Sequence, residues 1–164
     1  MWNIAFEGLL DLFPDEGRVN IVGYADDACL IVSGPSPKYL VRLMQKAVDA
    51  ALAWGARNSL HFAPKKTYVV LFTRCKVDPN LEKITVGGLA RPFLKEVTYL
   101  GLILDSRLLW LRHVYHKIGR AKALLLLVRN ASGKLWGLHP RMAIWHYRAI
   151  VRPMISYGLS LIHI

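Results

Sequence analysis

Two adjacent aspartates, Asp26 and Asp27, are the residues of this chain best suited to chemistry. They lie between two β-forming runs, residues 19–24 and 28–33, so we predict a hairpin whose tip is Asp26-Asp27. Carboxylates held this close repel each other and resist burial unless a cation lies between them. Magnesium (or manganese) binds oxygen ligands and phosphates together, and two such ions about 4 Å apart can activate an attacking hydroxyl and stabilise a leaving pyrophosphate. Asp-Asp is also an ordinary turn sequence, so a purely structural pair is the alternative.

The elements around this pair can be placed from their patterns. Residues 2–13 have helical spacing that stops at Pro14, and we predict a long amphipathic helix that begins at Ser36-Pro37 and ends at Gly55. The runs 66–73, 84–86 and 96–104 are predicted strands. The hairpin is therefore expected to belong to a sheet with packed helices.

The pattern changes after residue 105. Residues 110–129 and 140–157 are helical in pattern and are joined through Ser132-Gly133 and Trp136-Gly137, with Pro153 expected to kink the second helix. We therefore predict an α+β fold with one part at residues 1–105 and a helical part at residues 106–164.

The charge of the chain points to a polyanionic partner. Lys and Arg number 22 against 11 Asp and Glu, a net charge of +11, and no acidic residue follows Asp105. Such an excess attracts nucleic acid through counterion release, although a solvated helix face is the ordinary alternative. Two basic stripes at helical spacing are the candidate contacts to a nucleic-acid backbone: His113, Lys117 and Arg120, then Arg141, Arg148 and Arg152.

The remaining composition narrows the class of protein. Cys29 and Cys75 form no Cys-x-x-Cys pair, so neither a disulfide framework nor a zinc knuckle is predicted, and a reducing, intracellular setting is the default. His113 and His116 have no nearby partner for a zinc site. The longest aliphatic run is too short to span a bilayer, so we expect no membrane partner and no secretion signal.

The hairpin sequence resembles a known family. Residues 23–27, Gly-Tyr-Ala-Asp-Asp, between two apolar runs resemble the Tyr-x-Asp-Asp signature of reverse transcriptases, in the alanine form typical of non-LTR (LINE-type) retrotransposons and group II introns. The resemblance implies that Asp26 and Asp27 are catalytic metal ligands and that Tyr24 and Ala25 contact substrate and primer.

Three further blocks resemble the same family in the same order. Residues 54–74 look like the block in which a lysine protonates pyrophosphate, which makes Lys66 the candidate catalytic residue. Residues 99–105 look like the primer-grip block, so Tyr99, Leu100 and Gly101 are candidate primer-binding residues. Residues 110–158 are similar to the helical segment that completes the polymerase core, whereas residues 160–164 give no match.

The resemblance sets the expected function. It implies a partial palm at residues 1–105, a thumb-like segment at residues 106–164, an RNA template, a DNA primer and deoxynucleoside triphosphates as partners, and a place in the nucleus and in cytoplasmic ribonucleoprotein. The family's first catalytic aspartate lies upstream of the matched region, so we expect the chain to need the upstream part of a parent polyprotein and to be inactive alone.

Two other readings stay open. In the first alternative, the chain is a non-catalytic nucleic-acid-binding remnant of a decayed element. In the second, it is a plain basic α+β domain in which the turn occurs by chance. Four more acidic residues are candidate replacement ligands but are expected to be solvated surface groups: Glu7, Asp11, Asp15 and Glu16.

Overall fold

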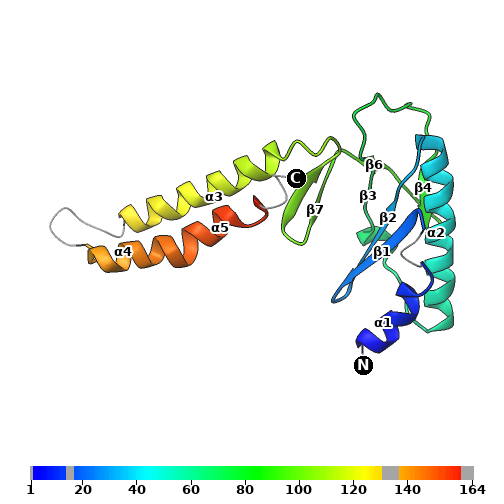
Figure 1. Cartoon of the computed structure of the whole chain (residues 1–164), viewed down its shortest axis with the longest axis horizontal. Coiled ribbons are helices and arrows are strands. Elements are labelled where there is room, and N and C mark those ends of the chain that lie inside the picture. The colour runs from blue at the N-terminus through cyan, green and yellow to red at the C-terminus, as the bar shows by residue number, and fades with distance from the viewer. Residues whose placement is uncertain (1, 14–16, 131–136, 160–164) are drawn as a thin grey trace. The chain divides into compact units, whose positions relative to one another are not determined.

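The computed structural model describes residues 2–13, 17–130 and 137–159, and it mixes helices and strands as the predicted α+β class requires (Figure 1). The chain divides into two compact units, residues 1–95 and residues 96–164. This division falls ten residues before the palm and thumb boundary predicted at residue 105, because the strands that follow residue 95 contact the C-terminal helices. The palm and thumb assignment itself stays a prediction.

The first unit is built around one hairpin and one long helix. Helix α1 (Trp2–Leu10) precedes strands β1 (Val19–Tyr24) and β2 (Asp27–Val32), which pair antiparallel, and helix α2 (Pro37–Arg57) follows. Both helices contact the hairpin, and Figure 1 shows α2 running along it. These elements confirm the predicted helix within residues 2–13 and the predicted hairpin.

Helix α2 begins where the sequence predicts. The Ser36 side chain accepts a hydrogen bond from the backbone N–H of Tyr39, and Pro37 occupies the first turn, where no intrahelical N–H bond is lost. The helix continues two residues beyond Gly55 and is closed by Asn58, whose side-chain amide donates to the carbonyl of Trp54. Its buried face contributes to both cores of the unit: Ala51 and Trp54 to one, and Val41 and Val48 to the other.

The predicted strand at residues 66–73 is wrong over most of its length. A 3₁₀ turn, η1 (Pro64–Lys66), occupies its start, and only β3 (Val69–Val70) is extended, paired parallel with β6 (Phe93–Leu94). Pro64 favours a helical first turn, and the Thr67 hydroxyl donates to the carbonyl of Ala63, which closes the turn.

The predicted strand at residues 84–86 is confirmed as β4 (Ile84–Val86), which pairs antiparallel with β5 (Leu89–Arg91). The side chain of Gln45 on α2 donates to the carbonyl of Thr85 at 2.9 Å and accepts from its N–H at 2.8 Å. One amide side chain therefore takes the place of a neighbouring strand and fixes α2 to β4.

The second unit is a hairpin followed by helices. Strands β7 (Glu96–Tyr99) and β8 (Leu102–Asp105) confirm the predicted strands at residues 96–104, and α3 (Leu111–Asn130) confirms the helix predicted at residues 110–129. The return segment is α4 (Pro140–His146), a π-helical turn η2 (Tyr147–Val151) and α5 (Arg152–Ser156), and α5 packs on α3. The predicted joints at Ser132, Gly133 and Trp136 lie outside the described residues.

This π-helical turn lies just before Pro153, where a kink is predicted from the sequence. Proline has no N–H for the helix ladder, and just before it the N–H of Arg152 bonds the carbonyl of Tyr147, one residue further back than in an α-helix.

Within the described residues, no helix combines the length and the apolar character needed to cross a bilayer.

Asp105 organises the loop between β8 and α3. Its carboxylate accepts from the backbone N–H groups of Arg107, Leu109 and Trp110 at 3.3, 3.1 and 3.0 Å, and Leu108 and Trp110 have positive φ angles of 53° and 63°. Partial burial raises the pKa of Asp105, but the N–H donors together outweigh it and lower this pKa below its ordinary value.

Asp105→Asn is expected to reduce the free energy of unfolding by about 1–2 kcal/mol near neutral pH, because charge-assisted bonds to a partly exposed loop are lost. The pKa of Asp105 is lower in the folded chain than in the unfolded chain, where it is about 3.9. The extra free energy of unfolding of the wild type is therefore fully present above about pH 3.9, and it is lost as the pH falls through the folded-state pKa. Urea denaturation of both proteins between about pH 3 and pH 7 measures this. An equal difference at both ends of the range would contradict it.

Candidate functional site

The hairpin tip differs by one residue from the prediction. Tyr24 pairs directly with Asp27, so the two-residue turn is Ala25-Asp26, and Asp27 is the first residue of β2. Ala25 has a φ of 50°, the positive value that the first position of a II′ hairpin turn requires. A positive φ is unfavourable for a residue that has a side chain, such as alanine. The turn preferences used on the sequence therefore placed Asp26-Asp27 at the tip and not Ala25-Asp26.

The register of the hairpin divides its residues between two faces. Ile21 and Leu30 are cross-strand partners and pack against the buried residues Phe6, Leu9 and Trp54. Residues at the alternate positions lie on the opposite face, which is open: Val22, Tyr24, Asp27 and Ile31 are all exposed there. Tyr24 and Asp27 therefore share the open face, and the Tyr24 side chain is 62% exposed.

The two carboxylates are exposed and without partners in the described part of the chain. Asp26 and Asp27 are exposed residues, and the side chain of neither forms a hydrogen bond or an ion pair with any described residue. Adjacent, solvated carboxylate oxygens are ligands suited to a magnesium ion. No group of three or more His, Cys, Asp or Glu side chains that could hold a metal forms among the described residues, so the pair fits part of a ligand set.

Two polar groups beside the open face were not singled out from the sequence. Burial raises the pKa of the Cys29 thiol, which opposes the thiolate form that binds metals. The side-chain oxygen of Asn20 is buried and has no hydrogen-bond partner among the described residues. Asn20 lies on the same face as Tyr24 by strand alternation, a placement that only the register reveals.

Lys66 lies in the same unit but on a separate segment. It is exposed at the end of η1, and no hydrogen bond or ion pair joins it to Asp26 or Asp27. The guanidinium of Arg91 donates to the carbonyls of Thr67 and Lys65 at 2.9 and 3.2 Å, on either side of Lys66. Arg91 thus fixes the backbone that carries Lys66, and no local sequence signal indicated this contact across 24 residues.

The predicted primer-binding residues form a hairpin turn in the second unit. Tyr99 pairs with Leu102, and the intervening Leu100 and Gly101 have φ angles of 47° and 77°. Positive φ at both central positions is the type I′ pattern that matches the twist of the strands. Leu100 and Gly101 therefore form the turn, and Tyr99 is the last residue of the strand before it.

The first basic stripe needs a correction. His113 is 2% exposed, its Nδ1 accepts from the backbone N–H of Ile103 at 3.2 Å, and its Nε2 lies 3.3 Å from the carbonyl of Tyr157. Both ring nitrogens are used inside the unit, so His113 is a buried structural residue here and not an exposed contact to a nucleic-acid backbone. Lys117 lies with its Nζ 4.6 Å from the ring centroid of Tyr157.

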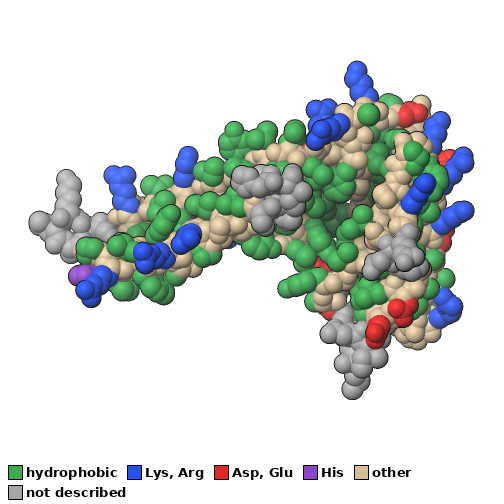
Figure 2. All heavy atoms as spheres, viewed as in Figure 1, with side chains coloured by type: hydrophobic (Ala, Val, Ile, Leu, Met, Phe, Trp, Pro, Cys, Tyr) green, Lys and Arg blue, Asp and Glu red, His purple; other side chains and the backbone are tan. Residues whose placement is uncertain are grey.

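The other predicted basic residues are exposed: Arg120, Arg141, Arg148 and Arg152. The helices α3, α4, η2 and α5 form the helical arm of the second unit, and Figure 2 shows Lys and Arg side chains spaced along this arm with hydrophobic side chains between them. Exposed hydrophobic residues on this arm include Leu126, Leu127, Trp145 and Tyr147. Glu7 and Asp11 are exposed as expected, whereas Asp15 and Glu16 lie outside the described residues.

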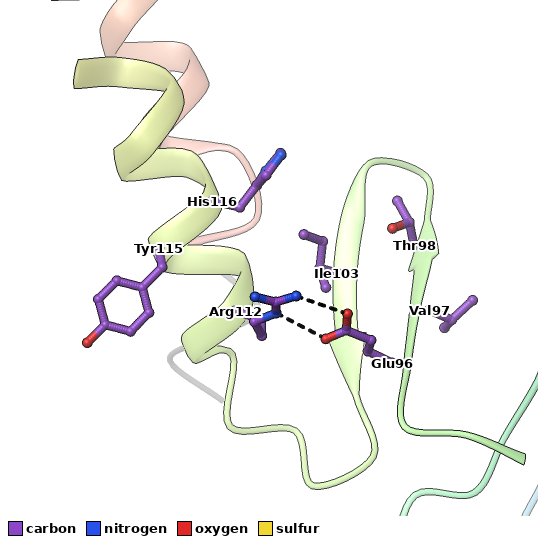
Figure 3. A pocket seen from close by; sticks show the side chains of 7 residues that line it. All are labelled: Glu96, Val97, Thr98, Ile103, Arg112, Tyr115 and His116. Carbon is purple, nitrogen blue, oxygen red and sulfur yellow. Dashed lines mark hydrogen bonds and ion pairs between the residues drawn. The ribbon is translucent and has the colours of Figure 1, made fainter. Parts of the chain in front are cut away.

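A groove of about 610 Å³ lies between hairpin β7–β8 and the start of α3 (Figure 3). At one side of it, the Arg112 guanidinium forms two bonds to the Glu96 carboxylate, at 3.2 and 3.3 Å, and this contact raises the pKa of Arg112. The ion pair is exposed and neutralises Arg112 locally, so the groove has no uncompensated arginine with which to bind phosphate.

Comparison with known proteins gives several relatives that match nearly the whole chain. It is 24% identical over 164 residues to a Pol polyprotein from type-1 retrotransposable element R1 of Nasonia vitripennis, covering 98% of this chain and 48% of that protein. It is 25% identical over 160 residues to the R1 Pol polyprotein of Bradysia coprophila, covering 98% of this chain and 16% of that protein.

A third relative is the RNA-directed DNA polymerase from mobile element jockey of Drosophila funebris, 27% identical over 148 residues, with 88% of this chain and 16% of that protein covered. No family model matches the chain, and no solved structure matches it. The chain thus spans about half or less of the length of these relatives, and its resemblance to non-LTR retrotransposon polymerase proteins is confirmed.

Gly23→Ala is expected to lower the free energy of unfolding by about 1–3 kcal/mol, because a methyl group there overpacks the interface between β1 and α1. A Cβ at Gly23 would lie only 2.1 Å from Cε1 of Phe6. Urea denaturation followed by circular dichroism measures the change, and Phe6→Leu should recover part of it in the Gly23→Ala background. Gly119→Ala is the matched control, since no atom lies within 4 Å of its Cβ position. Unchanged stability of Gly23→Ala would contradict this packing.

Proposed function

We propose that this chain is part of a reverse transcriptase, an RNA-directed DNA polymerase of a non-LTR retrotransposon. Residues 1–105 would contribute part of the palm, and the helices of residues 106–164 would contribute a thumb-like segment. The observation that carries the proposal is the hairpin tip, where two adjacent carboxylates without partners in the described residues stand beside the exposed Tyr24 on an open strand face. The relatives named as Pol polyproteins and RNA-directed DNA polymerase support it.

In this proposal, Asp26 and Asp27 hold magnesium, which supplies charge stabilisation for the attacking hydroxyl and the leaving pyrophosphate when it is bound. Other metal ligands would come from nucleotide phosphates and from the family's first catalytic aspartate, which the resemblance places upstream of the matched region. Tyr24 and Ala25 face substrate and primer on the open side of the hairpin. This division of ligands predicts that the chain alone does not extend primers.

Lys66 and the second hairpin have separate roles. Lys66 donates a proton to the leaving pyrophosphate, and its exposed position on a turn fixed by Arg91 supports a mobile side chain on a fixed backbone. Tyr99, Leu100 and Gly101 hold the primer end, and the I′ turn supports this role because its tight backbone lets a strand approach closely. RNA template, DNA primer and deoxynucleoside triphosphates are the partners.

A second candidate is nucleic-acid binding without catalysis. The exposed arginines of the helical arm and the absence of acidic residues after Asp105 favour it, because phosphate contacts alone suffice for sequence-independent affinity. The two candidates agree on binding and differ on whether Asp26 and Asp27 support chemistry.

The test is magnesium-dependent primer extension on an RNA template, with the chain alone and with the chain joined to whatever coding sequence precedes it in its genome. We expect extension only by the joined form, its loss in Asp26→Asn and Asp27→Asn, and a decrease in kcat of about a hundredfold or more in Lys66→Ala. Lys65→Ala is the matched control, since Lys65 lies on the same turn and is also exposed. Wild-type extension by Asp26→Asn would overturn the metal assignment. Binding of primer–template without extension by the joined form would favour the second candidate.

A further inference from the structure

The tip of hairpin β7–β8 is fastened to the end of the helical arm within the second unit. The hydroxyl of Tyr157 donates a hydrogen bond to the carbonyl of Leu100, at the centre of the turn. The same ring lies under the next residue, since a Cβ at Gly101 would be 3.6 Å from Cε1 of Tyr157. One aromatic side chain, 57 residues away in sequence, therefore contacts both central residues of the turn.

Contacts with the buried His113 and at Gly158 fix the backbone of Tyr157. Because Nδ1 of His113 accepts from the N–H of Ile103, the ring proton resides on Nε2 and is donated to the carbonyl of Tyr157. The adjacent Gly158 has a φ of 83°, and a Cβ there would lie 2.5 Å from Cδ2 of Leu102. His113 and Gly158 thus hold residues 157–158 close against β8.

The ammonium group of Lys117 lies beside the Tyr157 ring. Lys117 follows His113 by one helical turn, so both face the same side of α3, and its Nζ lies 4.6 Å from the ring centroid of Tyr157. A cation over an aromatic face is attracted by the ring and loses part of its rotational freedom. No hydrogen bond or ion pair joins Lys117 to a carboxylate in the described residues, so its charge remains available to an anion.

We propose that Tyr157 is a positioning residue for the primer: it fixes the turn at Leu100 and Gly101 and holds Lys117 beside this turn, where the lysine binds a phosphate of the primer strand. The inference rests on the proposed function, since it deepens the role of the primer-binding turn. It assigns Lys117, a candidate backbone contact from the sequence, to a phosphate of the primer strand beside this turn, and it adds Tyr157 as a residue that acts through Lys117. A tyrosine that only packs would stabilise the turn without coupling to the affinity supplied by Lys117.

The experiment measures the affinity of the full chain for a labelled RNA–DNA primer–template by fluorescence anisotropy, over a range of salt concentrations. Lys117→Gln is expected to weaken binding about three- to tenfold and to reduce the slope of log K against log salt by roughly 0.9, the value for one lost phosphate contact. Lys117→Arg should restore both. Tyr157→Phe keeps the ring and removes only the hydroxyl, so it should keep the slope but speed amide exchange in residues 99–102.

A double-variant cycle separates positioning from packing. If Tyr157 positions Lys117, the combination of Tyr157→Leu with Lys117→Gln should bind no more weakly than the weaker single variant. Lys122→Gln is the matched control on α3, and its effect should multiply with that of Tyr157→Leu. Tyr147→Phe controls for loss of an exposed tyrosine hydroxyl. Circular dichroism of each variant checks that it folds.

The outcomes distinguish the two proposals. If the wild-type chain does not bind primer–template, the proposed function fails and this inference fails with it. If the wild type binds but the effects of Tyr157→Leu and Lys117→Gln multiply, or Tyr157→Phe leaves amide exchange at residues 99–102 unchanged, this inference alone is overturned. Coupled effects with restored binding by Lys117→Arg support it.

Discussion

The register of hairpin β1–β2 is the constraint on which the candidate site depends. One face of the hairpin is buried because Ile21 and Leu30 pack on Phe6, Leu9 and Trp54, and complete burial of a side chain such as Leu9 contributes about 1.5–3 kcal/mol. A slip of one residue would exchange the two faces. It would turn the face of Tyr24 and Asp27 toward the core, where an unpaired carboxylate is strongly unfavourable. Burial of the apolar face therefore keeps Asp27 in solvent, next to Asp26 in the turn.

Outside this hairpin, single polar side chains bonded to the backbone do much of the positioning. The described strands form four two-stranded sheets. Several of these strands are only two or three residues long, so they supply few ladder hydrogen bonds. Gln45 pairs with Thr85, Arg91 bonds the carbonyls around Lys66, and His113 joins β8 to Tyr157. Each of these residues connects segments distant in sequence, which gives the candidate site residues a fixed backbone.

Local signals in the sequence were sufficient for the major elements. The Ser36-Pro37 start of α2, both hairpins and helix α3 follow from capping residues, strand runs and helical spacing, and the structure confirms them. Each candidate motif lies at the turn of a hairpin, and the roles of its residues stay predictions. These features depend on neighbours in the chain, so the sequence contains the information directly.

The errors arise where distant contacts decide. The strand predicted at residues 66–73 is mostly absent because Arg91 and the Pro64 turn satisfy its backbone differently. Helical spacing placed His113 in a basic stripe but could not show that this face is buried under β8 and Tyr157. The observed turn of hairpin β1–β2 lies one residue before the predicted one, because Ala25 adopts a positive φ that is unfavourable for a residue with a side chain.

The central claim is that the Ala25-Asp26 turn and Asp27 bind a divalent cation, and paramagnetic broadening tests it most directly. Manganese would be titrated into the isotopically labelled chain, with the amide signals followed by NMR. The account predicts that residues 23–28 broaden first, that Asp26→Asn combined with Asp27→Asn abolishes this effect, and that Asp49→Asn, a change at an exposed carboxylate on α2, leaves it intact. Broadening that centres elsewhere, or that persists in the double variant, would contradict the account.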